Sequence, residues 1–155
     1  YLMHQLVDGM IDLVVTFTPQ HRSGMVVEHL MEEQLVLVST DKYSASPLGA
    51  GYVYVDWGPE FRIIHMEAFP EHDTPIISVT YGPLALQLIL ANGGAAYLPI
   101  RLIRSMLDNG LLHIIEEAPV FPRQVYIVRL EGEETERFMT ATQGLRYVAS
   151  LESEA

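Results

Sequence analysis

The chain has 155 residues, of which 49% are hydrophobic, and nine Lys and Arg against twenty Asp and Glu give it a net charge of −11. This acidic balance would repel a phosphate backbone, so the chain by itself is expected to be a poor nucleic-acid binder. The absence of Cys excludes disulfides and thiolate chemistry and fits a reducing, cytoplasmic location. No apolar run reaches the roughly 18 residues of a membrane-spanning helix, and no signal-peptide pattern opens the chain, so we expect no membrane partner.

The N-terminal third predicts the end of a helix followed by strands. Residues 1–7 lack a helix start signal, so we expect the sequence to be a fragment of a longer protein, and Gly9 is a suitable helix stop. The β-branched residues 11–16 predict a buried strand. Two more strands are expected at 25–29 and 33–39, divided by a short polar turn. Residues 42–51, rich in Ser, Pro and Gly, predict a linker to a second lobe.

Strands and helices alternate along the next part of the chain. Strands are predicted at residues 52–56, 76–80, 95–98 and 111–116, and helices at 60–69, 84–91 and 101–108. This alternation implies parallel pairing with right-handed crossovers, which is α/β architecture. A second Pro-marked crossing at 118–122 leads to a strand at 124–130 and an amphipathic helix at 134–151. Two lobes joined by two crossings form a hinge with a cleft between them.

The segment from Thr80 to Pro99 carries the most specific local signals. Gly82 suits the N-cap and Pro83 the first helical position, while Gly93 or Gly94 can adopt the positive φ that ends a helix. In an open α/β sheet, ligands bind beyond the carboxyl ends of strands, where free helix N-terminal amides can receive an anion. The sequence therefore predicts ligand contacts at Thr80, Tyr81 and Gly82.

Four segments, in this order, resemble one known family. These are Leu6-Val-Asp-Gly-Met-Ile-Asp-Leu-Val-Val15, Glu33-Gln-Leu-Val-Leu-Val38, Asn92-Gly-Gly-Ala-Ala-Tyr-Leu-Pro99 and Leu107-Asp-Asn-Gly-Leu-Leu112. They resemble the effector-binding domain of LysR-type transcriptional regulators, whose fold is that of type 2 periplasmic binding proteins. The resemblance implies two Rossmann-like lobes joined by two crossover segments, with lobe I at 1–45 and 123–155 and lobe II at 46–122. It also implies that the family's first sensor strand and helix precede Tyr1.

The function implied by this resemblance is sensing of a small organic effector, anionic or aromatic, without a cofactor. The signal would reach an N-terminal winged helix-turn-helix, absent from this chain, through which a homodimer or homotetramer binds DNA. Thr16, Phe17 and Thr18 follow the first lobe's strand, where the family's cleft lies, although Thr16 could instead satisfy its own loop. Other candidate contacts are Trp57 and Phe61, for which core packing is the alternative, and Tyr97 and Pro99, of which Pro99 can also simply end a strand.

Other functions fit the sequence less well. His65 and His72 lie among Glu67, Glu71 and Asp73, but their spacing fits no zinc pattern, so no metal site is predicted. No nucleophile elbow, dinucleotide fingerprint or phosphate loop is present, so catalysis is not expected. The rival of the same fold is a secreted solute-binding protein that delivers ligand to a transporter. An enzyme resembling a prephenate dehydratase is the second rival.

Overall fold

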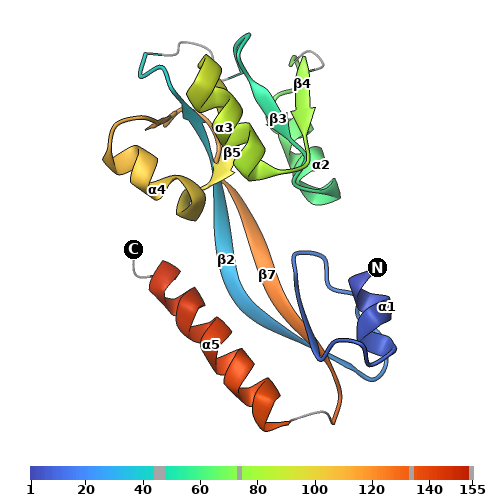
Figure 1. The fold of residues 1–155 in the computed structure, drawn as a ribbon. Helices are drawn as coiled ribbons and strands as arrows, with labels where there is room; N and C mark the ends of the chain where they lie inside the picture. Colours follow the sequence, from blue (N-terminus) through green and yellow to red (C-terminus); the bar gives the residue numbers. More distant parts are fainter. Residues whose placement is uncertain (44–47, 73–74, 133–134, 154–155) are drawn as a thin grey trace. The chain divides into compact units, whose positions relative to one another are not determined.

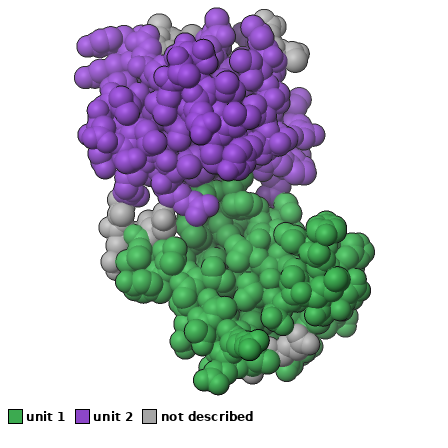
Figure 2. All heavy atoms as spheres, viewed as in Figure 1, with its two compact units in different colours: residues 1–33, 123–155 green, residues 34–122 purple. Residues whose placement is uncertain are grey.

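The computed structural model describes residues 1–43, 48–72, 75–132 and 135–153. The chain forms two compact units, one of residues Tyr1–Glu33 with Arg123–Ala155 and one of Gln34–Pro122 (Figure 2). The sequence placed the first crossing between lobes at 42–51, of which 44–47 lie outside the described residues. In the structure, the N-terminal segment of the first compact unit ends at Glu33. Whether the lobes of a ligand-binding domain follow these units stays a prediction.

The first unit is built on strands of the five-stranded sheet (Figure 1). Helix α1 spans Leu2–Val7, strand β1 Leu13–Thr16, strand β2 starts at Met25, β7 spans Phe121–Leu130 and helix α5 Glu136–Ser153. β1 pairs antiparallel with β7, with Val14 opposite Val128. The apolar core on this face contains Met3, Leu6, Val14 and Val128, because α1 lays its buried residues against the two strands.

β2 corrects one prediction from sequence. It runs without interruption over Met25–Ser39, where the sequence predicted two strands and a polar turn. The segment contains no Gly, Pro, Asn or Asp, so nothing in it favours a turn over extended backbone. The polar residues at its centre are accommodated as strand residues instead.

The second unit contains the predicted alternation of strands and helices. Its elements are the end of β2, β3 (Val53–Val55), α2 (Pro59–Ala68), β4 (Ile77–Val79), α3 (Gly82–Asn92), β5 (Ala95–Pro99), α4 (Ile100–Asp108) and β6 (His113–Ile114). β3 and β4 are parallel, as predicted, but β5 and β6 pair antiparallel with β2. The prediction of parallel pairing was therefore wrong for β5 and β6, because β2 enters this unit as a long strand with no preceding crossover helix.

Alternating side chains at residues 52–55, which include β3, and on β5 separate two cores in the second unit. Val53, Val55 and Leu98 pack with buried residues of α3 and α4, while Tyr52 and Tyr97 pack with Phe61 of α2. This is the period of two expected for strands covered on both faces. No helix in the described part of the chain is long and apolar enough to cross a membrane.

Helix α3 begins slightly earlier than predicted. Tyr81 is its N-cap and Gly82 its first residue, so Pro83 takes the second helical position. Gly93 and Gly94 end it with φ of +76° and +132°. A Cβ on Gly94 would lie 2.2 Å from the Gly51 carbonyl oxygen, so this position requires glycine for close backbone approach as well as for its φ.

Candidate functional site

The predicted contacts in the first unit lie at the end of β1. Thr16 is the last residue of the strand and half-buried, whereas Phe17 and Thr18 are exposed. The backbone N–H of Thr18 donates to Thr16 Oγ1 at 3.2 Å. This is the local loop hydrogen bond that was the alternative role for Thr16. It uses one acceptor site of the hydroxyl and leaves its proton available to a carboxylate.

A buried ion pair supports this loop. The Arg123 guanidinium lies 3.6 Å above the centre of the Phe17 ring and donates through Nη2 to Glu33 Oε2 at 2.5 Å. The Glu33 side chain is 2% exposed and that of Arg123 12% exposed. Sequence reasoning missed this pair because its members are 90 residues apart. The sequence signal that could have indicated the pair was a charged residue beside an apolar run on each of the two strands.

The predicted contacts in the second unit begin at the start of α3. Thr80 and Tyr81 are exposed, and Gly82 is buried. Tyr81 makes no side-chain capping hydrogen bond among the described residues, while its carbonyl accepts from the N–H of Leu84 at 3.1 Å. A helix start of this kind presents first-turn amides and the positive end of the helix dipole, which favour an adjacent anion.

Trp57 fixes this helix start to the neighbouring strand. Its Nε1 donates to the Tyr97 carbonyl at 2.9 Å. A Cβ on Gly82 would lie 2.5 Å from Trp57 Cη2, so the indole edge occupies the space that any side chain at residue 82 would need. Trp57 therefore packs between β5 and α3, which is the core-packing alternative, and Gly82 permits that packing.

Phe61, Tyr97 and Pro99 are buried in the second unit. The ring centroids of Phe61 and Tyr97 are 5.9 Å apart, and Phe121 packs 4.9 Å from Tyr97. The Tyr97 hydroxyl donates to the Pro119 carbonyl at 3.0 Å, and burial raises the pKa of this phenol. Pro99 pairs with Leu35 at the end of β5. Their place in this core makes them supports of the fold, and a role in ligand contact stays a prediction.

His65 is the titratable group at the centre of the same aromatic core. It is 5% exposed, and its Nε2 lies 2.9 Å from the Tyr52 hydroxyl. Burial, with a further contribution from His72, lowers the pKa of His65 to about 4, so the ring is neutral at pH 7. The described residues hold no group of three or more His, Cys, Asp or Glu that could bind a metal; Asp73 lies outside them.

Two cavities lie away from the predicted contacts. One, of about 500 Å³, is in the second unit and is lined by Lys42, Leu107, Leu112, His113, Ile114, Glu116 and Glu117. The other, of about 210 Å³, is in the first unit and is lined by Glu28, Arg129, Phe138, Met139, Thr142, Gln143 and Arg146. Sequence reasoning singled out none of the polar residues in these two linings.

Comparison with known families agrees with this architecture. The family model described as LysR substrate binding domain matches residues 1–143. The chain belongs to this family. It is a regulatory, effector-binding domain of the LysR type, and the predicted fold class, two α/β lobes of the type 2 periplasmic binding protein kind, is confirmed.

Comparisons with individual proteins also match LysR-type regulators. The regulator HdfR of Salmonella schwarzengrund is 23% identical over 137 residues, which cover 86% of this chain and 46% of HdfR. The chain thus spans about half the length of the curated relatives it matches. The regulatory domain of HypT from Salmonella typhimurium has a TM-score of 0.72 at 18% identity, covering 94% of this chain and 78% of that one. DarR from Vibrio fischeri, solved with DNA, has a TM-score of 0.74 over 93% of this LysR-type chain and 53% of its own.

These findings favour the regulatory function over its rivals. The LysR family is one of transcriptional regulators and not of enzymes. The secreted solute-binding alternative is not supported, because the matching proteins are LysR-type regulators.

Proposed function

We propose that this domain binds a small organic effector, anionic or aromatic, in a cleft between its lobes. Effector binding controls DNA binding by a winged helix-turn-helix domain of the whole regulator. The observation that carries this proposal is the match of the LysR substrate binding domain over residues 1–143. A same-fold regulator, LysG from Corynebacterium glutamicum, has been solved with the effector Arg bound, at a TM-score of 0.64, 19% identity and coverage of 97% of this chain and 55% of LysG.

Two groups of residues at strand ends are the proposed effector contacts. Thr16, Phe17 and Thr18 follow β1, and Thr80 and Tyr81 precede α3. All except half-buried Thr16 are exposed, and the α3 start offers amides and a dipole to a carboxylate. The remaining predicted ligand contacts lie in or against the core of the second unit: Gly82, Trp57, Phe61, Tyr97 and Pro99.

Control of DNA binding requires that the effector distinguishes two arrangements of the regulator. A ligand shifts such an equilibrium only by its difference in affinity for the two states. We propose that the regulator acts in the cytoplasm as a homodimer or homotetramer. A strictly monomeric regulator at high concentration, measured by sedimentation, would count against this assembly.

The test of the effector site is a double substitution, Thr16→Val with Thr80→Val. A panel of small carboxylic acids is first screened for thermal stabilisation of the chain, and hits are measured by calorimetry. Each hydroxyl lost from a charged ligand group removes a hydrogen bond, so the affinity falls roughly tenfold or more. The matched control is Thr140→Val, at an exposed position on α5. An unchanged affinity in the double variant would refute the assigned contacts.

A further inference from the structure

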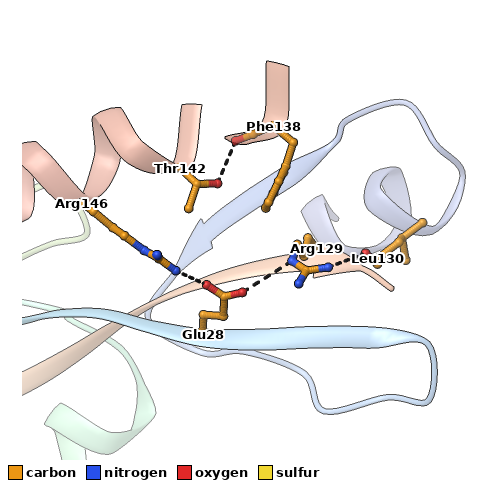
Figure 3. A network of polar contacts seen from close by, with 6 residues as sticks. All are labelled: Glu28, Arg129, Leu130, Phe138, Thr142 and Arg146. Carbon is orange, nitrogen blue, oxygen red and sulfur yellow. Dashed lines mark hydrogen bonds and ion pairs between the residues drawn. The ribbon is translucent and has the colours of Figure 1, made fainter. Parts of the chain in front are cut away.

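The cavity of the first unit brings opposite charges and apolar side chains together. Glu28 comes from β2, Arg129 from β7, and the remaining lining residues from α5. Figure 3 shows Glu28 between the two arginines, with Arg146 reaching it from the helix. Two of the chain's nine basic residues thus line one small cavity of a protein whose net charge is −11.

The two arginines hold Glu28 unequally. Arg146 Nη2 lies 2.5 Å from Glu28 Oε2, while Arg129 Nε lies 3.5 Å from Oε1, which is longer than an ordinary hydrogen bond. Arg129 also donates to the Leu130 carbonyl and lies 5.4 Å from the Phe138 ring centre. The side chain of Arg146 is 60% exposed, so a ligand can reach its guanidinium from solvent.

Apart from the exposed Gln143, the rest of the lining is apolar or already hydrogen-bonded. Phe138 is 7% exposed and Met139 53% exposed, so one forms a buried wall and the other an accessible one. The Thr142 hydroxyl donates to the Phe138 carbonyl at 2.9 Å. At about 210 Å³ the cavity is smaller than the roughly 300–1,000 Å³ of sites for drug-sized ligands, so its ligand must be small.

We propose that this cavity is a second binding site, specific for a small monocarboxylate with an apolar tail. The ligand carboxylate binds the Arg146 guanidinium, with Arg129 adding attraction, and the tail packs against Phe138 and Met139. Glu28 competes with the ligand for the guanidiniums and so limits its affinity. This site shares no residue with the proposed effector contacts, so its failure would leave the proposed function standing.

The experiment uses 3-phenylpropionate as the probe on the 155-residue chain carrying ¹³C-methyl methionine. Of seven methionines, Met139 lines the cavity and Met66, exposed on α2 of the second unit, is the internal reference. We expect a saturable shift of the Met139 methyl signal and none of Met66. The neutral analogue 3-phenylpropanol should bind at least several-fold more weakly, because it lacks the charge-assisted hydrogen bond.

Three substitutions separate a binding site from general electrostatic attraction. Arg146→Gln should weaken probe binding tenfold or more, since such a hydrogen bond contributes about that factor. Arg137→Gln is the matched control: it makes the same charge change on α5 at an exposed residue outside the lining, and should alter binding less than about twofold. Glu28→Gln should tighten binding several-fold, because it removes a like charge beside the carboxylate.

Several outcomes would overturn the proposal. One is the absence of a saturable Met139 shift, and another is equal weakening by Arg146→Gln and Arg137→Gln. Equal binding of 3-phenylpropanol would show that the cavity selects only apolar groups. Phenylalanine binding more tightly than 3-phenylpropionate, with loss on Glu28→Gln, would assign the cavity to a zwitterion and refute the monocarboxylate. Binding unchanged by Thr16→Val with Thr80→Val would confirm that the two sites are separate.

Discussion

The two units stabilise their buried polar groups in opposite ways. In the first unit the buried contact between distant strands is the charged pair of Glu33 and Arg123. In the second unit the corresponding contact is the neutral hydrogen bond between Tyr52 and His65, inside a cluster of aromatic rings. Removing one partner of a buried ion pair destabilises the fold, because the other charge stays buried without compensation. A neutral hydrogen bond to a buried His is instead disturbed when the imidazole is protonated.

This difference predicts which changes destabilise each unit. The first unit should be sensitive to loss of a single charge, and the second to acidification and to crowding of its packed rings. The single tryptophan, Trp57, lies in the second unit and reports on it by fluorescence. Hydrogen exchange of the β7 amides within residues 123–130 reports on the first unit. The comparison can therefore be tested unit by unit.

Glu33→Gln is expected to have the largest effect. It leaves the Arg123 guanidinium, 12% exposed, without its carboxylate, which costs about 3 to 5 kcal/mol in the free energy of unfolding. Exchange of the β7 amides in increasing urea measures the loss. It should exceed any change in the Trp57 transition of the second unit.

The control for this prediction replaces both charges. Glu33→Met with Arg123→Met should recover much of the lost stability, because apolar pairs of similar volume often replace buried ion pairs without cost. If the double variant is no more stable than Glu33→Gln, the uncompensated charge of Arg123 is not the cause of the lost stability. The proposed sensitivity of the first unit to loss of a single charge would then be wrong.

Gly82→Ala tests the packing side of the second unit. The new Cβ would lie 2.5 Å from Trp57 Cη2, so the indole must shift and its hydrogen bond to the Tyr97 carbonyl weakens. Overpacking of this kind costs about 1 to 3 kcal/mol. The Trp57 emission and its urea transition should both change. The same substitution at Gly144, whose Cβ would meet nothing within 4 Å, is the control and should not destabilise the chain.

The pH dependence of the second unit follows from His65. Its pKa is about 4 in the folded chain and about 6.5 unfolded, so the unfolded state binds the proton first as the pH falls. The stability is complete above about pH 6.5 and is lost progressively down to about pH 4. Between pH 7 and pH 5 the loss is about 2 kcal/mol.

Urea unfolding followed by Trp57 at the two pH values measures this loss. His65→Gln keeps a hydrogen-bond partner for Tyr52 but does not titrate, so its stability should vary less between pH 7 and pH 5. A variant with the full pH dependence of the natural chain would show that another group is responsible.

The sequence predicted the local features of this fold more successfully than the distant ones. Helix α3 and its glycine stop were found because Pro83, Gly93 and Gly94 act on neighbouring backbone. The continuous β2 was missed because the polar residues at 32–34 resemble a turn when their strand partners are unknown. Pairing direction was missed for β5 and β6 for the same reason, since it depends on the course of β2.

The predicted site shows the same limit. Phe17, Thr80 and Tyr81 were placed at exposed strand ends by local pattern, and the structure exposes them. Periodicity could not tell that Tyr97 is fully buried, with its hydroxyl held by the Pro119 carbonyl 22 residues away. Charged partners such as Arg146 and Glu28, 118 residues apart, carry no local signal at all.

Phe17→Leu should have the smallest effect, and it tests a single contact of the first unit's ion pair. The substitution keeps an apolar side chain under the Arg123 guanidinium but removes the aromatic face that lies 3.6 Å from it. A cation–π contact of this kind contributes about 0.5 to 1 kcal/mol, so exchange of the β7 amides should show a loss of that size. Phe17→Tyr retains the ring and should be neutral. Because the ion pair with Glu33 persists in both variants, equal stability of the Leu and Tyr variants would mean that the aromatic face does not help to hold Arg123 in place.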